Sequence, residues 1–319
     1  MAHDASLAGQ PGALDTQTAS TITKRVARLS VATAVVLIGL KLWAWLASGS
    51  VAMLSSLADS SLDGAASLFT LLAVGYAAMP PDEEHRFGHG KAEAMAAMVQ
   101  AMLVGISATL VAVEAIDRLT DPKPIAESAL ALVVMGVSIV LTLALIWAQS
   151  RAIAQTGSVA TKGDRAHYAS DLAANMAVII GISLAAFSGV AWADPLVGLL
   201  VAAWLGWSAF EVARGGWDQL LDSELDDASR TRITELALSA GGILEIHALR
   251  TRASGPTIHI QFHAELPPHL TLVEAHKAMV AAEKAILSEF PAADVLIHPD
   301  PRGRAEPHGH ESIALDEAS

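Results

Sequence analysis

The chain has 319 residues, of which 53% are hydrophobic, and its mean hydropathy is +0.44. So apolar an average is typical of a membrane protein and argues against an ordinary soluble domain. The net charge of −13 argues against a nucleic-acid partner, which basic patches would hold. The chain has no cysteine, which excludes thiolate metal sites and leaves imidazole and carboxylate as candidate metal ligands.

Six apolar stretches of membrane-spanning length follow a polar N-terminal tail. A helix needs about 20 residues to cross the ~30 Å hydrocarbon core of a bilayer. The tail, residues 1–20, has neither the basic start nor the apolar core of a secretory signal, and we expect it to be disordered. We expect a transmembrane domain over residues 21–220, with spans at about 26–46, 51–78, 92–116, 129–148, 166–190 and 195–212.

The basic residues predict the orientation of these spans. Lysine and arginine gather before the first span and after the even-numbered spans. Examples are Lys24, Arg86 and Arg151. The loops on the other side have only Arg118 and Lys123. Because cytoplasmic loops carry the excess of lysine and arginine, we expect both termini in the cytoplasm, as six spans require.

Residues 221–301 are rich in charges and predict a small soluble domain with the order α-β-β-α-β. A first helix ends before two glycines, two alternating strands are joined by Ser-Gly-Pro, and a second helix and a last strand follow. This order predicts an open-faced α+β sandwich. The expected helices lie at 227–240 and 272–290, and the strands at 247–253, 257–265 and 293–298. The tail at 302–319 is polar, and we expect it to be flexible.

The second span contains two carboxylates, Asp59 and Asp63, in the middle of an apolar run. A charge there costs about 2.5–3.5 kcal/mol or more unless it is paired or bound to a metal. The spacing of four residues puts both side chains on one face of the helix. A structural hydrogen bond between helices, or a carboxylate that reaches the interface, is the alternative. The position of these carboxylates deep in the apolar run, and the presence of two of them, favour a functional site.

The fifth span begins with a similar pair, His167 and Asp171, again four residues apart. Taken alone, this pair is equally compatible with a polar helix start that faces the cytoplasm. If the two faces meet, three carboxylates and one imidazole surround one point. Such a set suits tetrahedral Zn²⁺, and also Cd²⁺ or Fe²⁺, whereas an octahedral all-oxygen set would indicate Mg²⁺ or Mn²⁺.

The loop between the second and third spans contains Asp82, His85 and His89. These residues can form a second, more exposed metal site. A solvated polar loop is the alternative, and the spacing does not decide between them. The presence of two histidines, with glycines on both sides of His89, favours the metal site.

The soluble domain is rich in histidine. Along the strand predicted at 257–265, His259 and His263 lie on the face opposite to Ile258, Ile260 and Phe262. Neighbouring elements can bring further histidines to this face, and an aspartate follows the last of them. The clustering favours a cytoplasmic metal site, which can be binuclear, over solvated surface histidines. Six of the twelve histidines of the chain lie in this domain: His247, His259, His263, His269, His276 and His298.

Together these motifs resemble the cation diffusion facilitator family, and closely its bacterial zinc and ferrous-iron efflux members. The resemblance runs from about Arg25 to Pro301. Its most specific elements are the segments ADSSLD at 58–63, FGHGKAE at 87–93, HYASD at 167–171 and RTRASGP at 250–256.

The resemblance implies a six-helix transmembrane bundle followed by a cytoplasmic ferredoxin-like domain, in a Y-shaped homodimer. It implies that Lys91 and Asp222 form a charge interlock near the dimer interface. Pro299 departs from the family pattern, because proline fixes φ and cannot donate a backbone hydrogen bond. The implied metal ligands are Asp59, Asp63, His167 and Asp171 in the membrane, Asp82, His85 and His89 in the loop, and His247, His263, His276, His298 and Asp300 in the cytoplasmic domain.

The expected function is efflux of Zn²⁺, Cd²⁺ or Fe²⁺ across the bacterial inner membrane in exchange for protons, by alternating access. Metal binds deprotonated carboxylates and neutral imidazole, so binding releases protons, and His167 is a candidate for the coupled proton. A membrane metallohydrolase is a poor alternative, because the chain has no HExxH motif and four side chains would close the coordination shell. A metal sensor that transports nothing is the second alternative, which only a flux assay separates from a transporter.

Overall fold

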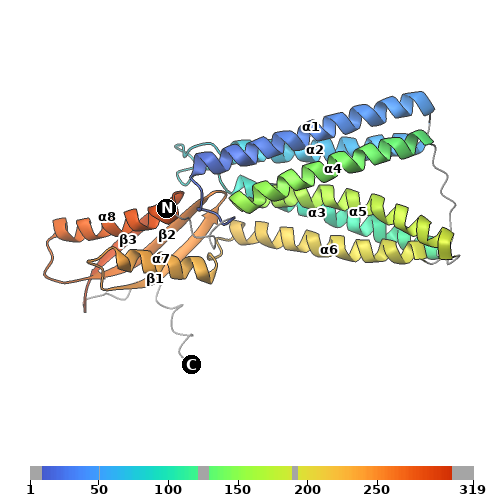
Figure 1. The fold of residues 1–319 in the computed structure, drawn as a ribbon. Helices are drawn as coiled ribbons and strands as arrows, with labels where there is room; N and C mark the ends of the chain where they lie inside the picture. Colours follow the sequence, from blue (N-terminus) through green and yellow to red (C-terminus); the bar gives the residue numbers. More distant parts are fainter. Residues whose placement is uncertain (1–8, 50, 121–128, 189–192, 304–319) are drawn as a thin grey trace.

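The computed structural model describes residues 9–49, 51–120, 129–188 and 193–303. Six long helices run side by side, and a small α/β domain lies at one end of them (Figure 1). The predicted fold class is therefore confirmed. The six helices are α1 (Thr16–Ser48), α2 (Val51–Ala77), α3 (Ala92–Thr120), α4 (Ala129–Thr156), α5 (Val159–Ser188) and α6 (Ala193–Leu220).

The N-terminal segment is more ordered than its polar composition indicates. Asp15 caps α1, because its carboxylate accepts a hydrogen bond from the backbone amide of Thr18 at 2.9 Å. The amide of Gly12 donates to the carbonyl of Pro256 at 3.1 Å, which fastens the segment to the small domain. The expectation of disorder is therefore wrong for residues 9–20. Residues 1–8 and 304–319 lie outside the described part of the chain.

Five of the described helices, α1, α2, α3, α4 and α6, are long and apolar enough to cross a membrane. The remaining long helix, α5, carries polar side chains along its first half and packs against α3, α4 and α6. Enclosure by apolar neighbours is the arrangement expected for a polar helix in a lipid environment.

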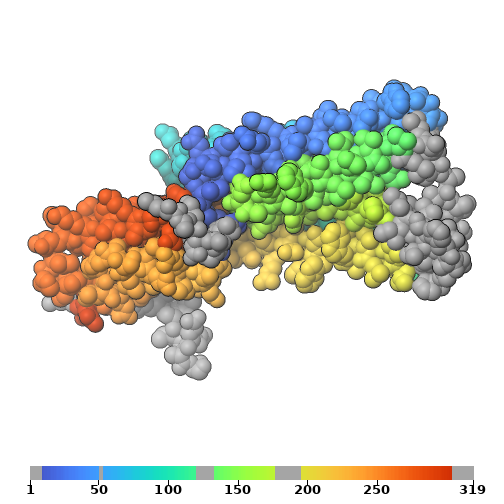
Figure 2. Space-filling model, viewed as in Figure 1, coloured from blue at the N-terminus to red at the C-terminus, as the bar shows by residue number. Residues whose placement is uncertain are grey.

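The outer surface of the bundle is apolar and its interior is built from small residues. Large apolar side chains such as Leu110, Trp147 and Trp207 are more than half exposed. The buried contacts between helices are made largely by alanines, such as Ala96 and Ala160, which let the helix backbones approach closely. Figure 2 shows the long flank formed by α1 and α4, with the small domain joined to one end.

The small domain folds in the predicted order, as α7 (Asp227–Ser239), β1 (Glu245–Ser254), β2 (Thr257–Leu266), α8 (Leu272–Glu289) and β3 (Ala293–Pro301). The strand order in the sheet is β1-β2-β3, with β1 antiparallel and β3 parallel to β2. Alternate residues of β2, including Ile260 and Phe262, are buried and form one core with Ile233 of α7 and Ile286 of α8. Both helices therefore cover one face of the sheet, and the histidine-bearing face lies opposite.

A substitution on α8 tests this core. Ile286 is fully buried, whereas Leu272 on the same helix is 81% exposed. We expect Ile286→Ala to lower the free energy of unfolding of the domain by about 2–5 kcal/mol, because it leaves a cavity. Leu272→Ala should change it by less than about 0.5 kcal/mol. Hydrogen exchange of the β2 amides in the full chain measures both, and equal effects would contradict the packing described.

A charge cluster joins the helix bundle to the small domain. Lys91, just before α3, contacts Asp222 at 2.9 Å, and Arg252 on β1 contacts the same carboxylate at 3.1 Å. Partial burial of Asp222 opposes its ionisation, but the hydrogen bond from Lys91 and the charge of Arg252 outweigh it and lower the pKa of the carboxyl. The interlock implied by the family resemblance thus exists within one chain.

The interlock should depend on pH. Because the folded-state pKa of Asp222 is depressed, its contribution to stability is present above the ordinary carboxyl pKa of about 3.9 and is lost as the pH falls through the folded-state value. At neutral pH we expect Asp222→Asn to increase amide exchange modestly at residues 220–224, since the pair is partly exposed. The difference from wild type should shrink as the pH falls below the ordinary carboxyl pKa of about 3.9 and through the lower folded-state value. A difference that does not shrink as the pH falls through this range would show that the carboxylate charge is not its cause.

Candidate functional site

The candidate site inside the bundle lies where α2 meets α5. The Nε2 atom of His167 lies 3.0 Å from Oδ1 of Asp63 and 4.0 Å from Oδ2 of Asp171. The ligand atoms of these three residues all lie within 4.8 Å of one another. Ligands of a tetrahedral zinc ion stand about 3.3 Å apart, given bonds of about 2.0–2.1 Å. The cluster therefore has the dimensions and the donor types of a small metal site.

Asp59 lies outside this three-residue cluster. It is one helical turn from Asp63 on α2, and its side chain is exposed on the surface of the chain. The structure thus brings together three of the four ligands predicted for the membrane site. The part of Asp59 in metal binding stays a prediction.

A buried hydrogen-bond network supports the cluster, and the sequence analysis did not identify it. Asp164, one turn before Tyr168 on α5, is 2% exposed. Its carboxylate accepts hydrogen bonds from Ser67 at 3.1 Å and from Gln149 at 2.8 Å. The hydroxyl of Tyr168 lies 3.0 Å from that of Ser67 and donates to the carbonyl of Ser30 at 3.2 Å. Because these residues come from four helices, the network fixes the position of α5 and so of His167.

A second group of candidate ligands lies in the loop between α2 and α3. The carboxylate of Asp82 is 3.2 Å from Nδ1 of His85 and 3.1 Å from Nε2 of His89. Hydrogen bonds to Asp82 from the backbone and ring of His85 lower the pKa of its carboxyl below the usual range. The ring of His89 is buried and meets Tyr76 edge-on at 4.5 Å. The three residues predicted for the loop site therefore lie together.

The third group lies across the sheet of the small domain. His247 of β1 and His298 of β3 both stand opposite His263 of β2 in the strand register. The carboxylate of Asp300, which is 4% exposed, lies 3.2 Å from His247, 2.9 Å from His263 and 3.4 Å from His298. One buried carboxylate thus contacts three imidazoles, an arrangement that can hold one or two metal ions.

The positions of His276 and Pro299 bear on the site predicted in the small domain. His276 is exposed on α8, and the structure does not bring it into the cluster around Asp300. Pro299 is in β3, which is an edge strand of the described sheet, and it stands opposite Ala264 of β2. An edge strand tolerates proline, because its outward amide is not needed by a neighbour. The proline therefore leaves Asp300 within the strand.

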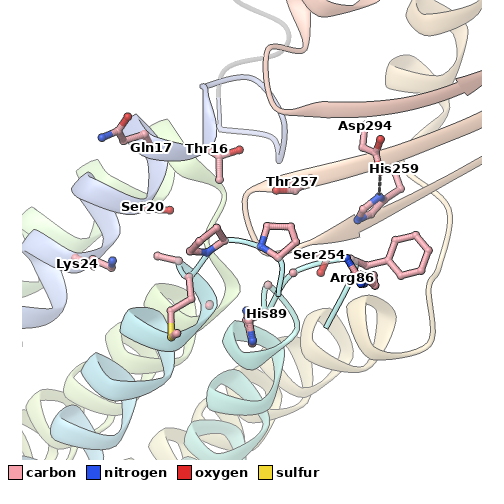
Figure 3. A pocket seen from close by; sticks show the side chains of 18 of the residues that line it. Thr16, Gln17, Ser20, Lys24, Arg86, His89, Ser254, Thr257, His259 and Asp294 are labelled. Atoms are coloured by element: carbon pink, nitrogen blue, oxygen red, sulfur yellow. Dashed lines mark hydrogen bonds and ion pairs between the residues drawn. The ribbon is translucent and has the colours of Figure 1, made fainter. Parts of the chain in front are cut away.

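His259, which shares the histidine-bearing face of β2 but is not among the ligands that the resemblance implies, is buried at the junction of the two domains. Its Nδ1 lies 3.0 Å from a carboxylate oxygen of Asp294, and its ring meets Phe87 of the loop edge-on at 5.7 Å. Figure 3 shows this pair beside the loop that carries His89, at the edge of a cavity of about 750 Å³. The face of β2 that was expected to be open is thus partly covered by the loop.

Gly90 explains how the loop approaches the sheet so closely. A Cβ atom at this position would lie 2.1 Å from the carbonyl oxygen of Ser254, the last residue of β1. Gly255, in the turn between β1 and β2, has a φ of +58° and faces the backbone of Gly90. The glycines of the FGHGKAE and RTRASGP segments therefore make one contact between the domains.

The helices of the bundle are long enough to cross a membrane, and clusters of carboxylates and imidazoles lie inside the bundle, in its loop and in the small domain. These features are typical of a membrane protein that handles metal ions. The profile of the cation efflux transmembrane domain matches residues 27–221, and that of the cation efflux cytoplasmic domain matches residues 225–302. The chain therefore belongs to the cation efflux family and is a multi-pass membrane protein. The members of this family are transporters, and the chain is a divalent-metal efflux protein of this kind.

Individual relatives agree with this assignment over nearly the whole chain. A protein of Shewanella oneidensis named cation-efflux pump FieF is 44% identical over 278 residues, which cover 87% of this chain and 94% of the relative. The protein of the same name from Cronobacter sakazakii is 39% identical over 280 residues, or 88% and 93% of the two chains. Among solved structures, the zinc form of CzrB is 30% identical, covers 27% of this chain and 99% of its own, and has a TM-score of 0.25.

The cluster around Asp300 offers a test with a matched control. Asp300→Asn replaces the carboxylate that contacts three histidines, whereas Asp294→Asn replaces one on the same strand that contacts His259. We expect the first variant to weaken zinc binding to this site by at least about tenfold and the second to leave it unchanged. Calorimetric titration of the purified full chain measures both. Equal losses in the two variants would refute the assignment of Asp300.

Proposed function

We propose that this protein exports a divalent metal ion, with zinc the first candidate and cadmium and ferrous iron the others, in exchange for protons. The observation that carries the proposal is the cluster of Asp63, His167 and Asp171 inside the helix bundle. Two carboxylates and an imidazole suit a borderline metal, whereas Mg²⁺ and Ca²⁺ prefer oxygen ligands alone. The order of metal affinities does not by itself name the physiological ion.

Proton exchange follows from the chemistry of these ligands. Carboxylates and imidazole bind metal in their deprotonated forms, so metal and protons compete for the same atoms. A site that faces a compartment with excess protons is reprotonated and gives up its metal. Alternating exposure of the cluster to the two sides of the membrane would therefore couple metal efflux to proton entry.

The proposed setting of the protein is the bacterial inner membrane, with both termini in the cytoplasm. Residues 21–220 would form the transmembrane domain and residues 221–301 the cytoplasmic domain. The distribution of lysine and arginine supports this orientation. The match to the cytoplasmic domain of cation efflux proteins supports a homodimer in which these domains meet.

The cytoplasmic cluster supports a regulatory part for the small domain. Asp300 and its histidines lie outside the membrane, where they sample the metal concentration of the cytoplasm. Metal bound there would join β1, β2 and β3 and stabilise the domain. In this proposal the cluster around Asp300 senses excess metal, and the cluster around Asp63 in the bundle transports it.

Zinc flux in proteoliposomes under a pH gradient tests the proposal. Wild-type protein should move zinc, and dissipation of the gradient should slow it. We expect Asp63→Ala to reduce the flux by at least about a hundredfold, because a ligand and its charge are lost. Asp218→Ala, which removes an exposed carboxylate at the end of α6, is the matched control and should keep the wild-type rate.

The outcomes separate the proposal from its alternatives. If Asp63→Ala retains the flux, the assignment of the transport site is wrong. If the wild-type protein binds zinc but moves none, it is a sensor and not a transporter. Asp59→Ala in the same assay decides whether the fourth predicted ligand takes part.

A further inference from the structure

A lysine lies in the apolar half of α1. Lys41 precedes the end of the helix at Ser48 by seven residues, which is about 10 Å along the axis. An ammonium at this depth is costly unless it faces the interior of the bundle and is paired. Lys41 meets both conditions, because its Nζ donates to the hydroxyl of Ser60 at 2.6 Å and to the carbonyl of Ser56 at 3.2 Å.

These two acceptors hold the ammonium beside the metal-binding cluster. Ser60 is 2% exposed and lies on α2, three residues before Asp63 and next to Asp59. Residues three apart share a helix face, and one turn separates them by about 5 Å along the axis. The ammonium accordingly experiences the electrostatic attraction of Asp63, Asp171 and Asp59.

The position of Lys41 along the bundle shows on which side of the metal-binding cluster its ammonium lies. In the orientation proposed above, α1 ends and α2 begins on the extracytoplasmic side of the membrane. Ser56 and Ser60 precede Asp63 along α2, so the ammonium lies between the cluster and that side. A metal ion that leaves the cluster outward therefore passes close to a positive charge.

We propose that Lys41 is a tethered counter-cation that sets the affinity and the release rate of the transported divalent metal. This inference rests on the proposed function and deepens it. With the cluster empty, the ammonium balances part of the carboxylate charge. With a divalent ion bound, the ammonium repels that ion, which lowers its affinity and speeds its departure. Lysine suits this task, because its charge is carried on a flexible four-carbon stem.

The expected size of the effect follows from Coulomb's law. A unit charge roughly 7 Å from a divalent ion changes the binding constant about sevenfold even with the screening of bulk water. The effect is larger inside a protein, where the effective dielectric constant is lower. Removal of the charge should therefore be visible in transport kinetics.

The test measures zinc flux against zinc concentration in proteoliposomes that contain the full chain. Lys41→Met removes the charge and keeps a long unbranched side chain, whereas Lys41→Arg keeps the charge. We expect Lys41→Met to lower KM about sevenfold or more and to lower the maximal rate as well, because release becomes slow. Lys41→Arg should keep both values within about threefold of wild type.

Ser60→Ala provides a second variant with the opposite expected sign. It removes the hydroxyl that holds the ammonium but leaves the charge, which is then free to approach the carboxylates and compete with the metal. We expect KM to rise in this variant, and the measurement stands even if Lys41→Met does not fold. A merely structural role for Lys41 would lower the maximal rate in both variants without moving KM in opposite directions.

The inference is overturned if Lys41→Met leaves KM unchanged or raises it, if Lys41→Arg behaves like Lys41→Met, or if Ser60→Ala lowers KM. Failure of the proposed function looks different, since wild-type protein would then carry no zinc flux. If wild type transports zinc and Asp63→Ala abolishes transport, but Lys41→Met leaves KM unchanged, only the part assigned to Lys41 is wrong.

Discussion

The cost of holding charged groups among apolar helices is the constraint on which the rest of the bundle depends. Two interior carboxylates meet this cost with partners on other helices: Asp63 with His167, and Asp164 with Ser67 and Gln149. These contacts draw α2, α4 and α5 together around a polar centre. The apolar side chains that would otherwise fill the centre lie instead on the outer surface, where they suit lipid. The packing of these helices, their apolar outer surface and the geometry of the site thus all follow from the cost of placing charged groups among apolar helices.

The site in the small domain rests on a different constraint, the register of the sheet. His247, His263 and His298 form one row because each stands opposite its neighbour in the strand pairing. A shift of one residue in either pairing would turn a histidine to the opposite face, which is filled by the core of α7 and α8. The geometry of the site therefore depends on the same strand register as the hydrophobic core on the opposite face of the sheet.

Much of this arrangement could be predicted from the sequence. Hydrophobic length located the long helices, alternation located β1 and β2, and the spacing of four placed His167 and Asp171 on one face. Local patterns did not identify contacts whose partners are distant in sequence. Asp164 precedes the span predicted at 166–190, and no local pattern indicated its contacts with Ser67 and Gln149. The segment around Gly12 looked loose for the same reason, since its backbone partners lie in the small domain.

The contact between Gly90 and Ser254 has a consequence for how the two domains move. Only a hydrogen atom fits between these backbones, so the loop cannot slide along the turn of the sheet without first separating from it. That loop is the direct continuation of α2, which carries Asp63, and it leads into α3. A tilt of the sheet should therefore move the adjoining ends of α2 and α3 as well. The close backbone contact that Gly90 permits thus couples the two domains mechanically.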